Sequence, residues 1–153
     1  MDDGALGILE QRRVEAGVIK PIYEEMKAVL GVEVAQRILG SAIKKAAIAF
    51  GEELRDGPTS LATFADLLPR WTKGDALQIK VINQTEAELD YNVTRCRYAE
   101  MYHEMGLSEI GHLLSCNRDG SFCEGYDPRI TLERTQTIMQ GATHCDFRYR
   151  FKP

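Results

Sequence analysis

Two residues with the chemistry of a hydrolytic site, Cys116 and Asp119, lie three positions apart in the segment CNRDGSFCEGYD (116–127). The segment has no clean hydrophobic period, so we expect a loop, and loops on a rigid scaffold often carry catalytic groups. A cysteine becomes a nucleophile when a nearby cation or base lowers its pKa. The aspartate could orient a base, pair with Arg134 or activate water. The alternative, which the residue types alone favour, is a buried thiol beside an aspartate that caps a turn.

Strand alternation assigns faces to further candidates near the end of the chain. In the predicted strand 145–151, Cys145 and Phe147 share the apolar face, and Asp146 points the other way. In the preceding strand, Arg134 falls on the apolar side. An unpaired buried charge is very costly, so we expect Arg134 to bind a carboxylate or a ligand anion. A bulge or an edge position would instead let it reach water.

The four cysteines form no close CxxC pair. In a chain without a secretory signal we expect them to be reduced, and therefore catalytic, metal-binding or packed. A metal site from Cys96, Cys116 and Cys145, with Asp119 as fourth ligand, is conceivable. Its spacing matches no structural zinc pattern, so we rank it below a site without metal. Neither a P-loop nor GxGxxG is present, and we expect no cofactor.

The composition sets broad limits on function. A net charge of -4 argues against a nucleic-acid binder, and 44% hydrophobic residues are typical of a soluble globule. The N-terminus MDDGALGILEQRR is acidic and lacks a long apolar core, unlike a secretory signal. No segment approaches the roughly 18 apolar residues that span a bilayer. We therefore expect a cytoplasmic protein that binds neither nucleic acid nor membrane.

The first half of the chain predicts a layer of helices over residues 1–70. A helix begins at Pro21 and stops at Gly31, and apolar residues at three-and-four spacing predict a long helix over 34–54. A third helix is closed by Pro69. The long helix has apolar residues on more than one face, which could serve the core or a contact in a homo-oligomer; the core is the better use.

The second half, residues 75–153, switches to period two and carries the sheet and the site. Two strands form a hairpin, two short helices and the loop follow, and two strands end the chain. The strands are expected over 77–81, 89–93, 130–139 and 145–151, and the short helices over 98–105 and 108–114. This order predicts one α+β domain over 1–153. Its helical N-terminal half packs on a mainly antiparallel four-stranded sheet, with two short helices inserted between the strand pairs.

Three segments of this half resemble the L-2-amino-thiazoline-4-carboxylic acid hydrolase family. They are CRYAEMYHEMGLSEIGHLLSC (96–116), RD (118–119) and LERTQTIMQGATHCDFRYRF (132–151). The resemblance is strong in the C-terminal third and covers the helical half only in general layout. Cys123 is not part of the pattern. The matching positions are Cys96, Cys116, Asp119, Arg134, Thr137, Gly141, Cys145, Asp146 and Phe147.

The resemblance implies a hydrolase that opens a five-membered heterocycle by adding water to its C=N unit. Its substrate would be a small molecule with a carboxylate or cyclic amide. Arg134 would clamp the carboxylate, and Asp119 would protonate the ring nitrogen. Cys116 or Cys145 would attack the ring carbon, or a water held by Asp119 would do so. We favour Cys116, because it lies on the loop whereas Cys145 forms a wall of the pocket.

Of the remaining matched positions, Cys96, Thr137, Asp146 and Phe147 would contact the substrate. Two alternatives belong to other classes. One is a binding or sensory domain that holds a small acid without turnover, since fold does not decide function. The other is a metal-dependent hydrolase with the cysteines as ligands.

Overall fold

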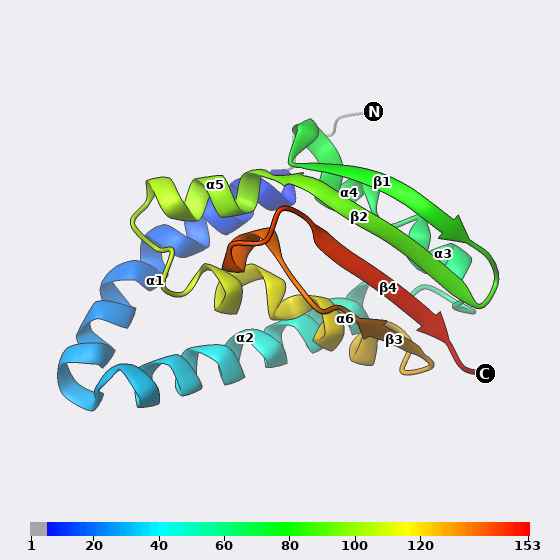
Figure 1. Cartoon of the computed structure of the whole chain (residues 1–153). Coiled ribbons are helices and arrows are strands. Elements are labelled where there is room, and N and C mark those ends of the chain that lie inside the picture. Colours follow the sequence, from blue (N-terminus) through cyan, green and yellow to red (C-terminus); the bar gives the residue numbers. More distant parts are fainter. Residues whose placement is uncertain (1–5) are drawn as a thin grey trace.

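The computed structural model describes residues 6–153 and confirms the α+β class, with helices first and an antiparallel sheet after them (Figure 1). The α-helices are α1 (Ile8–Leu30), α2 (Val32–Leu54), α3 (Leu61–Ala65), α4 (Pro69–Thr72), α5 (Arg97–Glu104) and α6 (Arg118–Tyr126). The strands are β1 (Leu77–Gln84), β2 (Glu88–Cys96), β3 (Ile130–Glu133) and β4 (Cys145–Phe151). Short helical turns occupy Lys73–Asp75, His112–Cys116 and Ile138–Gln140.

The sheet has the order β1-β2-β4-β3, and every neighbouring pair is antiparallel. The predicted hairpin is β1–β2, and β4 lies between β2 and β3 (Figure 1). Tyr91 stands opposite Phe147 and stacks on it with ring centroids 4.9 Å apart. Cys145, Phe147 and Tyr149 are all buried, as strand alternation predicted. This inner face of the sheet is one wall of the site.

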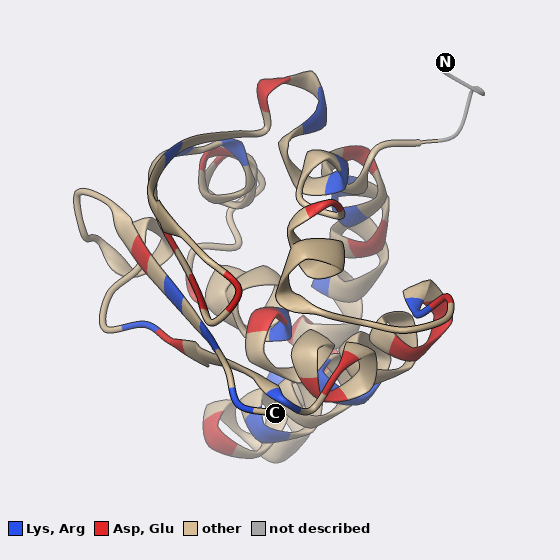
Figure 2. Cartoon of the chain, turned by 90° about the vertical axis from the view of Figure 1, so that its right-hand side faces the viewer, with Lys and Arg blue, Asp and Glu red and all other residues tan. Residues whose placement is uncertain are grey.

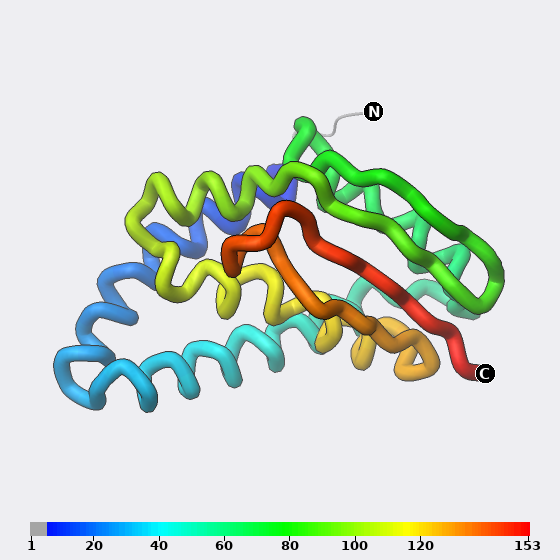
Figure 3. The backbone as a smooth tube through the Cα atoms, in the orientation of Figure 1, coloured from blue at the N-terminus to red at the C-terminus, as the bar shows by residue number. Residues whose placement is uncertain are grey.

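Helix α6 lies between α2 and the sheet, where the yellow and orange tube crosses above the cyan one (Figure 3). Two glycines allow the two helix backbones to touch. A Cβ atom added at Gly125 would lie 1.9 Å from the carbonyl oxygen of Ile48, and one added at Gly51 would lie 2.3 Å from that of Phe122. These contacts hold α6, whose first turn carries Asp119, against α2.

Several predicted boundaries are wrong. The segment 116–127 is mostly helix α6 rather than a loop, because its packing on α2 compensates for a weak hydrophobic pattern. Strand β3 ends at Glu133, well before residue 139. Pro21 lies inside α1 on an exposed position, where water can bind the carbonyl that the ring leaves unpaired. Pro69 begins α4 instead of closing the preceding helix.

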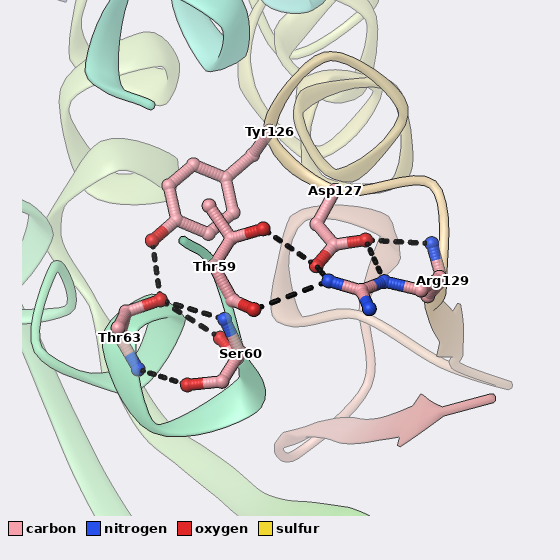
Figure 4. Close-up of polar contacts among 6 residues, drawn as sticks. All are labelled: Thr59, Ser60, Thr63, Tyr126, Asp127 and Arg129. Atoms are coloured by element: carbon pink, nitrogen blue, oxygen red, sulfur yellow. Dashed lines mark hydrogen bonds and ion pairs between the residues drawn. The ribbon is translucent and has the colours of Figure 1, made fainter. Parts of the chain in front are cut away.

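A polar cluster joins the α2–α3 connection to the end of α6 (Figure 4). Thr59 Oγ1 donates to Asp127 Oδ2 at 2.8 Å, and Arg129 Nη2 donates to the same oxygen at 2.9 Å. Tyr126 donates its hydroxyl to Thr63 Oγ1 at 2.7 Å. These contacts hold the C-terminal end of α6, as the glycine contacts hold its middle.

Charged residues of both signs are spread over the helices and strands (Figure 2). Within residues 6–153, no helix is both long enough and apolar enough to cross a membrane.

Candidate functional site

A cavity with two adjoining lobes lies between the inner face of the sheet and helices α1, α4 and α6. The lobes have volumes of about 60 and 70 Å³ and adjoin one another, so together they approach the roughly 150 Å³ of a cavity that holds a benzene ring. Both are lined by Arg12, Trp71, Leu77, Arg118, Asp119 and Phe147. The first lobe extends toward aromatic residues, and the second toward three cysteines.

Asp119 is placed in the first turn of α6, and its carboxylate borders both lobes. Its side chain is 25% exposed. Burial raises the pKa of Asp119, and the attraction and hydrogen bond of Arg134 offset only part of that effect. Among the described residues that line the lobes, it is the only carboxylate. It is therefore suited to exchange a proton with a bound ligand.

Arg134, just beyond β3, is occupied by protein partners. Its Nη1 donates to Asp119 Oδ2 at 2.6 Å, its Nη2 donates to the carbonyl oxygen of Cys116 at 3.1 Å, and its guanidinium lies over the Phe147 ring at 5.1 Å. The expectation that Arg134 has a carboxylate partner is confirmed. Burial by itself would lower the pKa of Arg134, but the Asp119 carboxylate raises it. Arg134 lines neither lobe.

The cations that do face the cavity are Arg12 and Arg118, neither of which is among the site residues predicted from the sequence. Arg12 is buried in α1 and donates to Glu15 Oε1 at 2.9 Å. Arg118 donates to Glu15 Oε2 at 3.1 Å and to the carbonyl oxygen of Leu114 at 2.6 Å. Burial lowers the pKa of Arg118, and the neighbouring Arg12 lowers it further. Two guanidinium groups thus share one glutamate beside the cavity.

A signal for Arg12 was present in the sequence. The buried residues of this part of α1 include Ile8, Arg12 and Ala16, which recur every four residues. An arginine within such an apolar stripe indicates a buried charge that needs partners. The predicted helix began only at Pro21, so this stripe was overlooked.

Cys96, Cys116 and Cys145 line the second lobe, and all four cysteines are free thiols. Cys96 Sγ accepts the backbone N–H of Ala99 at 3.4 Å, and Cys145 Sγ accepts that of Ile138 at 3.2 Å. Burial raises the pKa of Cys96 to about 11. The pKa of Cys116 is raised more, by burial and then by the Asp119 charge. These environments favour neutral thiols over thiolates.

Within the described part of the chain, no group of three or more His, Cys, Asp or Glu side chains is placed to hold a metal ion. The three cysteines border a common lobe without forming such a group.

Two other matched residues organise the connection between β3 and β4. Asp146 Oδ1 accepts the backbone N–H groups of Thr135 and Gln136, each at 2.9 Å, and its other oxygen accepts the Thr135 hydroxyl. Thr137 is buried, and its Oγ1 accepts the backbone N–H of Gln140 at 3.2 Å. Neither Asp146 nor Thr137 lines the lobes, whereas Phe147 borders both.

Comparison with known proteins gives one match by sequence and several by fold. The family model for L-2-amino-thiazoline-4-carboxylic acid hydrolase matches residues 11–149. No curated protein matches the chain in sequence.

Two solved structures share the fold. The phenol-responsive sensory domain of the transcription activator PoxR with phenol has a TM-score of 0.53 and 9% identity, covering 88% of this chain and 73% of its own. A trafficking protein particle complex subunit 3 from Naegleria fowleri, covalently bound to palmitic acid, has a TM-score of 0.52 and 15% identity, covering 94% and 96%. At these identities the likeness describes the fold alone.

Proposed function

We propose that this chain, which belongs to the L-2-amino-thiazoline-4-carboxylic acid hydrolase family, adds water to a small cyclic amidine or amide that carries a carboxylate. One observation carries the proposal. The Asp119 carboxylate, fixed by Arg134 at 2.6 Å, borders both lobes of a cavity that also presents Arg12 and Arg118. Family membership supports hydrolysis, and this geometry supports the assignment of roles.

Asp119 acts as the acid and then as the base. Because burial raises its pKa, the carboxyl retains a proton more readily than a solvated aspartate does. It gives that proton to the ring nitrogen, which makes the adjacent carbon more electrophilic. The resulting carboxylate removes a proton from the water that attacks this carbon. Collapse of the tetrahedral carbon breaks one ring bond, and the proton passes to the leaving atom.

Arg12 and Arg118 bind the substrate carboxylate in this proposal, in place of Arg134. The two guanidinium groups face the cavity and share the single negative charge of Glu15, so the pair keeps a net positive charge toward a ligand. Arg134 instead positions Asp119, since its own donors are directed at Asp119 and Cys116. A charge-assisted contact to arginine suits a carboxylate.

Water is the favoured nucleophile, and the three cysteines form the wall of the second lobe. A thiol reacts as its thiolate, and burial raises the pKa of Cys96, Cys116 and Cys145. The Asp119 charge beside Cys116 opposes thiolate formation further. If a thiol does attack, Cys116 is the candidate, because the other two accept backbone N–H groups.

Binding without turnover is the second candidate function, and one observation favours it. The first lobe is lined mainly by apolar and aromatic side chains, and a sensory domain of similar fold is described with phenol. In that case the arginines would hold a small acid, and Asp119 would contribute only affinity.

The deciding experiment is mass spectrometry of 2-amino-thiazoline-4-carboxylate incubated with the wild-type protein, Asp119→Asn and Cys116→Ala. The wild type should convert the substrate to a product heavier by one water. Asp119→Asn should lower kcat by about 100-fold or more, the usual contribution of a positioned acid–base group. Cys116→Ala should retain most of the activity. Full activity in Asp119→Asn would remove its catalytic role, and binding without any product would favour the sensory function.

A further inference from the structure

The first lobe has a lining unlike that of the second. Its far end is built from the rings of Phe50, Phe64, Trp71 and Phe122 together with Leu68. Phe122 lies edge-on to Trp71 with centroids 5.3 Å apart, and edge-on to Phe50 at 5.7 Å. The polar residues of the first lobe lie where it meets the second lobe, and both lobes share them: Arg12, Arg118 and Asp119.

We propose that the ligand of this site carries an apolar, preferably aromatic, substituent that occupies the first lobe while its carboxylate stays near Arg12 and Arg118. The inference rests on the proposed function for the reacting group and extends it to the substrate class. The substrate is thus a substituted cyclic amidine or amide acid, larger than the unsubstituted thiazoline.

Geometry supports a substituent in the first lobe, beyond the reacting group. An unsubstituted five-membered ring with a carboxylate carries little apolar surface to bury against Phe50, Phe64 and Phe122, which line the far end of the first lobe. A ligand ring can pack edge to face on these rings, as Phe122 does on Phe50, and aromatic groups prefer this geometry. Because both lobes share a polar border, one bound molecule can place such a group in the first lobe and its reacting ring beside Asp119. Sites of this kind are usually mainly apolar with a few polar groups that fix orientation.

A binding experiment can test the lobe independently of hydrolysis. Propanoate and 3-phenylpropanoate contain no hydrolysable ring and differ by one phenyl group. In calorimetric titration of the wild-type protein, 3-phenylpropanoate should bind at least roughly tenfold more tightly than propanoate, because its ring is buried in the first lobe. Leu68→Phe narrows the lobe and should remove most of this preference. Leu67→Phe adds the same ring at a neighbouring position that does not line the lobe, and should keep the preference.

Turnover supplies the second arm, with 2-amino-thiazoline-4-carboxylate and its 5-phenyl derivative as substrates. A higher kcat/KM for the phenyl derivative, lost in Leu68→Phe and kept in Leu67→Phe, supports the substrate class. A phenyl preference in binding with no turnover of either ring supports the lobe and counts against the hydrolase. Equal binding of the two acids, or a preference that survives in Leu68→Phe, overturns the inference even if the unsubstituted ring is hydrolysed.

Discussion

The Arg134 guanidinium and the Asp119 carboxylate form a hydrogen-bonded ion pair at 2.6 Å, which joins the end of β3 to the first turn of α6. The side chains are 17% and 25% exposed. The attraction between two such shielded charges must compensate for their lost hydration, and it does so only when the hydrogen-bond geometry is good. The second Arg134 hydrogen bond, to the carbonyl oxygen of Cys116, fixes the guanidinium on the turn that precedes α6. Asp119 is therefore oriented before any ligand arrives.

Replacement of Arg134 by methionine should change the pH dependence of activity in a defined direction. Arg134 lowers the pKa of Asp119, so its loss should raise that pKa further. In the proposed mechanism Asp119 begins protonated, and activity falls as pH rises through its pKa. The alkaline limb of the kcat/KM profile should therefore move to higher pH, with a lower maximum because Asp119 is less well oriented.

The free energy of unfolding of Arg134→Met should be about 1–3 kcal/mol lower than that of the wild type, because the partly buried Asp119 loses its partner. Arg95→Met is the control, because Arg95 forms an exposed ion pair with Glu100 outside the cavity. That pair contributes at most about 1 kcal/mol. A pH profile that shifts equally in both variants would contradict the positioning role of Arg134.

The sheet could be predicted because its signals are local. Alternation along β2 and β4 shows which side chains face inward, and the short polar connection between β1 and β2 indicates a hairpin. The pairing of Tyr91 with Phe147 depends on strands that are distant in sequence. No local pattern specifies it, although the antiparallel class follows from the short connections.

The site was less predictable, because it depends on contacts between distant segments. Helix α6 contains Gly120 and Gly125, which disfavour a helix on propensity alone. Its stability comes from α2, where Gly51 permits the close approach. The sequence offered pairing with Arg134 as one of three roles for Asp119, and the cost of a buried charge predicted a carboxylate or a ligand anion beside Arg134. It gave no sign that Arg12, more than a hundred residues earlier, would border the same cavity.

The thiols should react slowly in the folded protein. Burial raises the pKa of all four cysteines, and Cys96 reaches about 11, so little thiolate exists at pH 8. Iodoacetamide labelling at pH 8, followed by peptide mass spectrometry, should be at least about tenfold slower in native protein than in urea. Rapid labelling of Cys116 alone, with loss of activity, would instead indicate an activated nucleophile.

The free energy of unfolding should fall at acid pH, because Asp127 becomes protonated and loses its ion pair with Arg129. Hydrogen bonds from Arg129, opposed by burial, lower the pKa of Asp127 to about 2 in the folded protein. The unfolded carboxyl has a pKa near 3.9, so the stabilisation is complete above that value and is lost as pH falls toward about 2. The contribution is at most about 3 kcal/mol.

Asp127→Asn should therefore be less stable than the wild type at pH 7 and should lose less stability between pH 4 and pH 2. Urea unfolding at several pH values measures both effects. Asp66→Asn, at an exposed position that ends α3, is the control and should leave the acid dependence unchanged. Parallel acid dependence in Asp127→Asn and the wild type would assign the stabilisation to other groups.

The approach of α6 to α2 can be tested with two alanine substitutions in one helix. Gly125→Ala would place a Cβ 1.9 Å from the Ile48 carbonyl oxygen, and 2.8 Å from its carbon, so the backbones must separate. We expect a loss of about 3 kcal/mol or more, together with lower activity because Asp119 lies on the displaced helix. Gly120→Ala meets no atom within 4 Å and should be neutral or up to about 1 kcal/mol stabilising. Urea unfolding and kcat are measured for both variants, and similar stability of the two would show that the close contact does not position α6.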